Sequence, residues 1–288
     1  MVIYSHSRLS TFEQCKLKFK FRYIDKIKPE IEKSIEAHLG TCVHNTLEWL
    51  YKQVKEGKVP NLDEVIVHYS EVWQKEFKEE FVIVKKQLTA KDYYNKGIEF
   101  IIGYYTDHQP FEDGTIELEK KVIINLKDES GNTYNMIGFV DRLAKNPETG
   151  VLEVHDYKTG NYLPDQEKMD KDRQLALYSI AIKDNHGHDK DVHLIWHYLA
   201  HKTKILSKRT NDQLAQLKKE TINLIKQIES TQEFPPNESA LCHWCEYKSM
   251  CPVFNKKPEK QAQKDRQTKV HNPINKNKYP TISKYIKD

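Results

Sequence analysis

Two aspartates and one lysine have the types and spacing for metal-assisted hydrolysis. Asp156 and Lys158 lie in the string HDYKTG, where one residue separates them. If this string forms a β-strand, both side chains project from the same face, because strand side chains alternate. A carboxylate can hold a hard divalent cation through oxygen, and a neighbouring ammonium can orient an attacking water or balance developing charge. The pair suits phosphodiester hydrolysis, with a surface salt bridge as the alternative.

Asp141 is the second candidate carboxylate. It lies in GFVDRL, at the end of the preceding predicted strand, and the turn-rich string NPETG follows it. Paired strands lie only about 4.8 Å apart, so Asp141 and Asp156 can share one cation. Mg²⁺ or Mn²⁺ is expected, because Mg²⁺ keeps several waters and needs few protein ligands. The alternative for Asp141 is an ion pair with Arg142 or with another nearby cation.

Three residues on predicted helices could support this site. His44 lies in GTCVHNTLEWL, one turn after Gly40, and glycine lets a backbone or a nucleic acid approach closely. In RQLALYSIA, Gln174 and Tyr178 are four residues apart on one helical face, where an amide and a phenol could hold phosphate or metal-bound water. The alternatives are a structural role for the histidine and packing for the tyrosine.

A cysteine group near the C-terminus predicts a second metal site. Cys242, Cys245 and Cys251 form CHWCEYKSMC, a CxxC followed by five residues and a third cysteine. A CxxC can be a redox pair or half of a metal site, and a metal generally takes a fourth ligand. Cys15 can supply it if the N-terminal helix packs beside the C-terminal segment. His243 is the competing ligand.

The elements that must position these residues follow from periodicity. An amphipathic helix is expected from Ser7 or Ser10 until shortly before Pro29, with Ser10 and Glu13 as a capping box and a basic set that could face phosphates or solvent. Further helices are expected at 34–55, 62–81, 91–108, 172–184 and 211–230. Strands are expected at 115–126, 132–143 and 150–158, as an antiparallel meander, and at 192–200 and 204–207. This pattern predicts an α/β fold, in which a mixed central β-sheet with an antiparallel meander is flanked by helices and the N-terminal part is helical.

Composition excludes several classes of protein. No run approaches the roughly 18 to 20 apolar residues of a membrane span, and the N-terminus lacks the pattern of a signal peptide, so we expect a cytoplasmic protein without a membrane partner. Five cysteines in 288 residues are too few for a disulfide-built scaffold, and Cys42 is expected to be a small buried hydrophobe. Residues 255–288 carry ten Lys/Arg against three Asp/Glu, whereas the rest carries 36 against 39. We expect a domain at 1–254 and a basic, disordered tail at 255–288.

The ordered set of GTCVH, GFVDR, HDYKTG and QLALY resembles the RecB-type branch of the PD-(D/E)xK nuclease superfamily over residues 5–254. The resemblance implies a restriction-endonuclease-like core and a metal-dependent nuclease. Carried over position by position, it implies a metal held by the side chains of His44, Asp141 and Asp156 and by the backbone carbonyl of Tyr157. It also implies that Lys158 is catalytic and that Gln174 and Tyr178 support the catalytic aspartates.

Cys15 together with CHWCEYKSMC resembles the iron–sulfur staple of RecB-like nucleases, such as CRISPR-associated spacer-acquisition nucleases and AddB-type nuclease domains. The resemblance implies a structural [4Fe–4S] cluster on Cys15, Cys242, Cys245 and Cys251, with zinc as the other occupant that the spacing allows. Cys251 followed by proline matches the usual ending. Lys16 departs from the pattern, because relatives often carry proline after the first cysteine.

The expected function is therefore a DNA nuclease that uses Mg²⁺ or Mn²⁺, acting as an exonuclease on single-stranded DNA or DNA ends in repair, recombination or CRISPR spacer processing. No GxxxxGK[ST] phosphate loop occurs, so any unwinding requires a helicase partner, and a spacer role would involve an integrase. The alternatives are a catalytically silent nucleic-acid-binding module and a zinc-stabilised adaptor.

Overall fold

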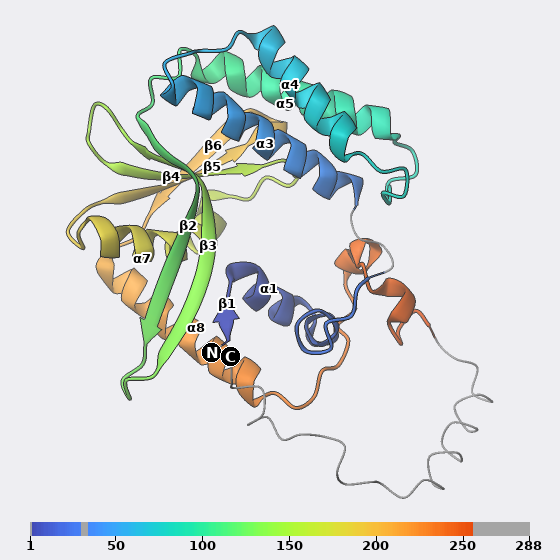
Figure 1. Cartoon of the computed structure of the whole chain (residues 1–288). Coiled ribbons are helices and arrows are strands. Elements are labelled where there is room, and N and C mark those ends of the chain that lie inside the picture. Colours follow the sequence, from blue (N-terminus) through green and yellow to red (C-terminus); the bar gives the residue numbers. More distant parts are fainter. Residues whose placement is uncertain (1, 30–33, 256–288) are drawn as a thin grey trace, which may run out of the picture.

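The structure is a computed structural model that describes residues 2–29 and 34–255 (Figure 1). The strands are β1 (Ile3–Tyr4), β2 (Thr115–Lys127), β3 (Thr133–Lys145), β4 (Leu152–Lys158), β5 (Val192–Tyr198) and β6 (Thr203–Lys208). The α-helices are α1 (His6–Gln14), α2 (Lys16–Phe19), α3 (Ile35–Lys55), α4 (Leu62–Glu76), α5 (Ala90–His108), α6 (Gln166–Asp170), α7 (Gln174–His186) and α8 (Asn211–Ser230). Short π- or 3₁₀-helical segments are η1 (Lys20–Ile24), η2 (Leu199–His201), η3 (Ala240–Trp244) and η4 (Lys248–Met250).

The strands form one mixed sheet in the order β1-β3-β4-β5-β6, and β2 pairs with β3 outside this path. The neighbours β2, β3 and β4 are antiparallel, which confirms the predicted meander. The pair β4 and β5 is parallel, and α7 makes the crossover between them. Helices α3, α4 and α5 lie on one side of the sheet, and α7 and α8 lie on the other (Figure 1). The predicted α/β fold with a helix-flanked mixed sheet is therefore confirmed.

Both faces of the sheet are buried. On the α7 side, Leu177 and Ile182 pack with Trp196 of β5, and all three are fully buried. On the α3 side, Leu47 packs in a second core that includes Tyr157 of β4. Six of the seven residues of β4 are consequently buried, including polar ones. Polar groups at this depth need partners, so β4 is a place where hydrogen bonds and ion pairs must be specific.

The predicted N-terminal helix is interrupted at Cys15. Ser5, rather than Ser7 or Ser10, caps α1, because its side chain accepts a hydrogen bond from the backbone N–H of Arg8. Cys15 is extended, with φ −161° and ψ 111°, and α2 and η1 follow it. The C-terminal segment supplies the bonds that the helix gives up: Asn237 Nδ2 donates to Gln14 O at 2.8 Å. The apolar periodicity continues through this interruption, so the pattern alone predicts one helix.

The predicted end of the third helix is also wrong. Helix α4 ends at Glu76, five residues before the predicted end at Phe81, and Phe77 has an extended backbone. Phe77 and Phe81 both pack against the ring of His38 in α3, with centroids 6.0 and 4.7 Å away. The aromatic spacing therefore reflects burial against α3 rather than a longer helix.

The predicted tail lies almost wholly outside the described residues, since 256–288 are not described. Within the described part of the chain, none of the helices has the length and apolar character needed to cross a membrane.

Replacing Gly97 by alanine should destabilise the helical layer that carries His44. A Cβ at Gly97 of α5 would overlap the phenol of Tyr69 in α4 and lie 2.8 Å from Leu39 Cδ1 in α3. Overpacking of this kind typically costs about 1–3 kcal/mol, so thermal unfolding should show a melting temperature several degrees lower. Gly160→Ala is the matched control, because a Cβ at that position would meet no other atom within 4 Å. Equal melting temperatures for the two variants would contradict the close packing of α3, α4 and α5.

Candidate metal and catalytic site

Strands β3 and β4 bring the two candidate aspartates together. Arg142 pairs with His155, so the antiparallel register places Asp141 next to Asp156. Asp141 Oδ2 accepts a hydrogen bond from the backbone N–H of Tyr157 at 2.9 Å. Burial and the nearby charge of Asp156 raise the pKa of Asp141 well above its ordinary value. The two carboxylates therefore lie close together in a mostly buried position. A cation bound there would stabilise their negative charges.

His44 extends from α3 to the same place. One imidazole nitrogen, Nε2, lies 2.8 Å from the carbonyl oxygen of Tyr157. The other nitrogen, Nδ1, lies 3.4 Å from Asp141 Oδ2. The structure therefore brings together the imidazole nitrogen, the carboxylate and the backbone carbonyl that the sequence analysis named as metal ligands. Gly40, one turn earlier in α3, permits this approach, since a Cβ there would lie 3.3 Å from Thr159 Oγ1, just beyond β4.

Lys158, Asp156 and Gln174 form a closed triangle beside these donors. Lys158 Nζ lies 2.7 Å from Asp156 Oδ2 and donates to Gln174 Oε1 at 3.0 Å. Gln174 Nε2 donates to Asp156 Oδ1 at 3.1 Å, so both ends of the amide are used. Burial alone would lower the pKa of Lys158, but the charges of Asp156 and Asp141 outweigh it and the pKa is raised. The lysine is therefore held as an ammonium.

Tyr178 lies one turn after Gln174 on α7, on the same face of the helix as predicted. Its ring packs closely against Gly138 of β3, where a Cβ would overlap the ring. Burial raises the pKa of Tyr178, which also interacts with Gln174 and with the charges of the two aspartates. Tyr178 thus lies beside the carboxylates and remains a neutral phenol at neutral pH.

Glu119 of β2 completes the group, and the sequence reasoning did not select it. Ligand atoms of His44, Glu119 and Asp141 all lie within 4.8 Å of one another. The pairing of Leu118 with Arg142 places Glu119 across from Asp141. A register count would have found it, since the hairpin turn DESGN is centred on residue 130, midway between 119 and 141. Glu119 also has a left-handed backbone with φ 45°, a strained conformation that often marks functional positions.

These residues fit a hard divalent cation. The donor set of imidazole nitrogen, carboxylate oxygen and backbone carbonyl is one that Mg²⁺ and Mn²⁺ accept. Mg²⁺ holds its ligands at about 2.0–2.1 Å in an octahedron, so neighbouring ligands lie about 3 Å apart. The distance of 3.4 Å between His44 Nδ1 and Asp141 Oδ2 is close to that value, and ligand atoms of His44, Glu119 and Asp141 all lie within 4.8 Å of one another. Asp156 Oδ2 is buried and, within the described residues, makes no hydrogen bond besides its ion pair with Lys158.

Replacing Glu119 by glutamine should weaken metal binding. The change keeps the shape of the side chain but removes its negative charge, and groups that support metal ligands typically contribute 10–100-fold in affinity. Titration with Mn²⁺ should therefore show roughly a tenfold or greater loss. Glu117→Gln is the control, because Glu117 is in the same strand and pairs with Lys120 instead. Equal Mn²⁺ affinities of the two variants would show that Glu119 is not a metal ligand.

Acidification should also weaken metal binding. Because burial, Asp156 and Glu119 raise the pKa of Asp141, protons compete with a cation at a higher pH than usual. Mn²⁺ affinity should therefore fall on acidification, beginning at a higher pH than for an ordinary aspartate, and Asp141→Asn should bind weakly at every pH. Without metal, the folded state holds this proton more tightly than the unfolded chain does. The raised pKa therefore contributes stability at low pH, and that contribution is lost as the pH rises through the folded pKa. A pH-independent affinity would contradict this account.

A buried polar network lies behind the site and fixes Tyr157. The alternative pairing of Asp141 with Arg142 does not occur: Arg142 Nη1 lies 2.7 Å from Asp113. Arg142 Nε donates to Tyr157 Oη at 3.1 Å, and Arg142 Nη2 lies 3.0 Å from His155 Nδ1. Both Arg142 and His155 are fully buried or nearly so. Because the backbone of Tyr157 contacts both His44 and Asp141, this network helps to position the candidate metal ligands.

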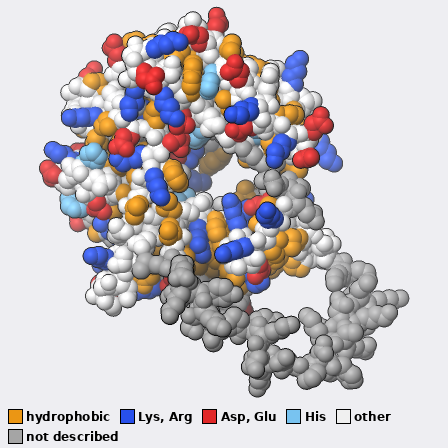
Figure 2. Space-filling model, in the orientation of Figure 1, with side chains coloured by type: hydrophobic (Ala, Val, Ile, Leu, Met, Phe, Trp, Pro, Cys, Tyr) orange, Lys and Arg blue, Asp and Glu red, His pale blue; other side chains and the backbone are white. Residues whose placement is uncertain are grey.

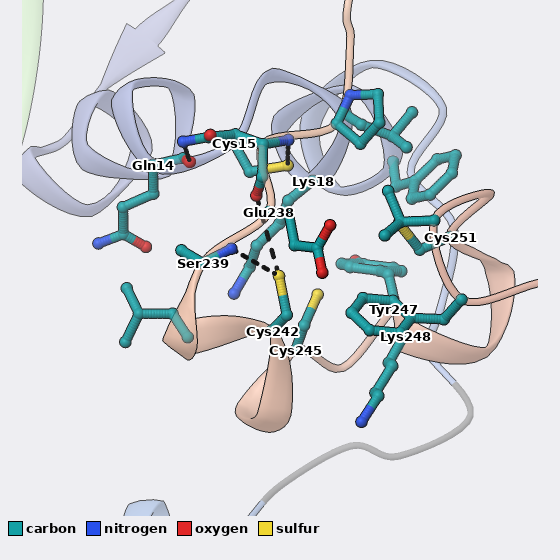
Figure 3. Close-up of a pocket in the computed structure, with 17 residues that line it drawn as sticks. Gln14, Cys15, Lys18, Glu238, Ser239, Cys242, Cys245, Tyr247, Lys248 and Cys251 are labelled. Carbon is teal, nitrogen blue, oxygen red and sulfur yellow. Dashed lines mark hydrogen bonds between the residues drawn. The ribbon is translucent and has the colours of Figure 1, made fainter.

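The four predicted cluster cysteines line one pocket at the junction of α1 with the C-terminal segment (Figure 3). They are Cys15, Cys242, Cys245 and Cys251, and none of the described cysteines forms a disulfide. The backbone N–H groups of Asn237 and Ser239 each donate to a cysteine sulfur at 3.4 Å. Burial raises the pKa of Cys245, and Glu246 and Cys15 add to the shift. A set of four sulfurs with backbone N–H donors fits an iron–sulfur cluster or zinc, because both bind thiolates.

The two other cysteine-region predictions concern His243 and Cys42. His243 lines a neighbouring cleft, which it shares with Cys245, whereas Cys15, Cys242 and Cys251 line the thiol pocket and not that cleft. Cys42 is fully buried in the core of α3, α4 and α5.

Comparison with known proteins agrees with this architecture. The sequence model of the PD-(D/E)XK nuclease superfamily matches residues 3–252. Among solved structures, the chain is similar to "Putative exonuclease" from Eubacterium rectale, with 13% identity, a TM-score of 0.50 and coverage of 85% of this chain and 87% of that one. It is also similar to SSO0001, with 16% identity, a TM-score of 0.36 and coverage of 59% and 77%. No curated protein matches the chain. Because the family match spans most of its length, the chain belongs to the PD-(D/E)XK nuclease superfamily.

Proposed function

We propose that this protein is a Mg²⁺- or Mn²⁺-dependent deoxyribonuclease of the RecB-like branch, acting as an exonuclease on single-stranded DNA or DNA ends. The observation that carries the proposal is the Lys158–Asp156 ion pair next to the group formed by His44, Glu119 and Asp141. A held ammonium beside a cluster of metal-ligand atoms suits the hydrolysis of a phosphodiester, because the metal can activate water and the ammonium can balance developing charge. Roles in repair, recombination or CRISPR spacer processing, with a helicase or integrase as partner, would follow from this activity.

The proposed role of each residue follows from its contacts. His44, Asp141, Asp156 and the carbonyl of Tyr157 would hold the divalent cation, and Glu119 would add a further carboxylate. When bound, this cation supplies Lewis-acid activation of the phosphate and of the attacking water. Lys158 positions the nucleophile and balances the charge that develops on the phosphate.

Gln174 and Tyr178 support these groups. Gln174 holds Lys158 and Asp156 in one orientation through its two hydrogen bonds. Tyr178 excludes water from the α7 side of the carboxylates by packing on Gly138.

We assign a structural [4Fe–4S] cluster to Cys15, Cys242, Cys245 and Cys251. The cluster would join the N-terminal helices to the C-terminal segment, so that metal binding contributes directly to folding. Protein purified without oxygen should be brown and contain iron and sulfide. A colourless protein that contains zinc would contradict the iron–sulfur assignment and show that the four cysteines bind zinc.

The test of the nuclease is cleavage of end-labelled oligonucleotides by the full-length protein. Single-stranded DNA should be degraded with Mg²⁺ or Mn²⁺ and remain intact with EDTA, and Asp141→Asn should be inactive. Oligonucleotides blocked at the 5′ or the 3′ end would give the direction of attack. Cleavage that persists in EDTA, or that Asp141→Asn retains, would refute the proposal.

A further inference from the structure

A cleft of about 490 Å³ lies between the cysteine region and the helical layer. Its volume is within the range of about 300–1,000 Å³ typical of ligand pockets. One wall consists of Ser34 and Ala37 at the start of α3 and of Val82 and Val84. Figure 2 shows that this face of the molecule is hollowed between the part that contains α3 and the part that contains α1, with Lys and Arg side chains at the edge.

The opposite wall is basic. Lys18, Arg22 and Lys248 line it, and Glu246 is the one carboxylate among the lining residues in the described part of the chain. Glu246 lies 2.8 Å from Lys18 Nζ and 3.7 Å from Arg22 Nη1, so one acid is shared by two of the three cations. The wall therefore keeps an excess of positive charge. Lys18 and Arg22 belong to the basic set of the N-terminal helical segment, which the metal site does not use.

Trp244 is the aromatic residue of this wall. It is 42% exposed, whereas Trp196 is 0% and Trp73 is 6% exposed. An indole with this exposure inside a cleft has a ring face that is available for stacking with a planar group of a ligand. The CxxC loop holds it in place, because Trp244 lies between Cys242 and Cys245.

An exposed aromatic ring between basic side chains is the arrangement that binds single-stranded nucleic acid: cations track the phosphates and bases stack on the ring. From this combination we infer that the cleft binds single-stranded DNA and that Trp244 stacks on an unpaired base. The inference rests on the proposed nuclease function and adds the residues that guide the strand.

The cleft is close enough to the candidate active site to serve it. Ala37 lines the cleft and His44 lies seven residues further along α3. At 1.5 Å per residue, this separation is roughly 10 Å along the helix axis. A strand held at Trp244 can therefore continue along α3 towards the carboxylates.

Binding is measured by fluorescence anisotropy with the full-length protein and a labelled oligothymidylate of roughly 15 nucleotides, in EDTA so that no cleavage occurs. Trp244→Ala should weaken binding roughly 5- to 100-fold, and Trp244→Phe should retain most of the affinity. DNA should quench the tryptophan fluorescence of the wild type, and this quenching should disappear in Trp244→Phe. Leu241→Ala is the matched control, because Leu241 is exposed in the same η3 segment but lines the thiol pocket.

A second variant avoids the cysteine loop altogether. Arg22→Gln should lower the affinity and reduce the salt dependence of binding by about 0.7 in slope. Lys20→Gln should have a smaller effect, because Lys20 is in the same η1 segment but pairs with Asp25 outside the cleft. If Trp244→Ala loses iron, Arg22→Gln decides the outcome.

The outcomes separate this inference from the proposed function. If the wild type binds the oligonucleotide through Trp244 but no divalent metal permits cleavage, the nuclease proposal fails and the cleft assignment stands. If the protein cleaves DNA but Trp244→Ala and Arg22→Gln bind like their controls, the cleft assignment fails. The cleft assignment would also fail if Trp244→Ala weakened the binding of a blunt duplex as much as that of the single strand, because paired bases are not available for stacking.

Discussion

Replacement of Lys158 by methionine is expected to reduce the rate of DNA cleavage roughly 10²- to 10³-fold. The change keeps an unbranched side chain of similar length but removes the ammonium that lies 2.7 Å from Asp156. The ammonium that Asp156 and Gln174 hold could then no longer position the nucleophile or balance the charge of the transition state. Single-turnover cleavage with saturating Mn²⁺ is the measurement, since it reports the chemical step separately from product release.

Metal and DNA binding distinguish this loss from misfolding. The Lys158→Met protein should still bind Mn²⁺ and single-stranded DNA. Lys183→Met is the control, because Lys183 is in α7 and bonds to Asn211, away from the candidate site. Activity that survives in Lys158→Met, or is lost equally in both variants, would remove the catalytic role of Lys158.

Replacement of Cys245 by serine should have the largest effect on stability. Metal binding to a structural thiolate site can contribute on the order of 10 kcal/mol to folding. Cys15→Ser should act in the same way, although the two residues lie at opposite ends of the described chain, because both line one pocket. Iron content should fall and the melting temperature should drop sharply in both variants.

The control for the cysteine series is Cys42→Ala. Cys42 is buried in the other core, so its loss should lower stability slightly while iron content stays unchanged. If Cys15→Ser kept its iron while Cys245→Ser lost it, the cluster would not join the two ends of the chain.

The fold and most of the site could be predicted because local rules agree with the tertiary structure. The alternation in HDYKTG and the NPETG turn place Asp141 beside Asp156, and both features act over a few residues. The i to i+4 spacing likewise places Gln174 and Tyr178 on one face of α7. Such arrangements need no knowledge of distant contacts.

The features that the sequence did not predict depend on long-range packing. The interruption at Cys15 arises from Asn237, more than two hundred residues away, which bonds to Gln14. Glu119 joins the site through the register of β2 with β3, which only a count outward from the DESGN turn would have given. The buried network also needs distant partners, because Arg142 pairs with Asp113 ahead of β2 and His155 lies 2.9 Å from His197 of β5.

Selection for thermal stability alone would favour glycine at position 119. A glutamate with φ 45° in a strand adopts a conformation that costs non-glycine residues free energy. Libraries screened only for heat resistance should therefore accumulate variants that lose this carboxylate, exchanging metal affinity for robustness. Under the proposed function, Glu119 would represent a trade-off in which the carboxylate is retained although its backbone conformation costs stability.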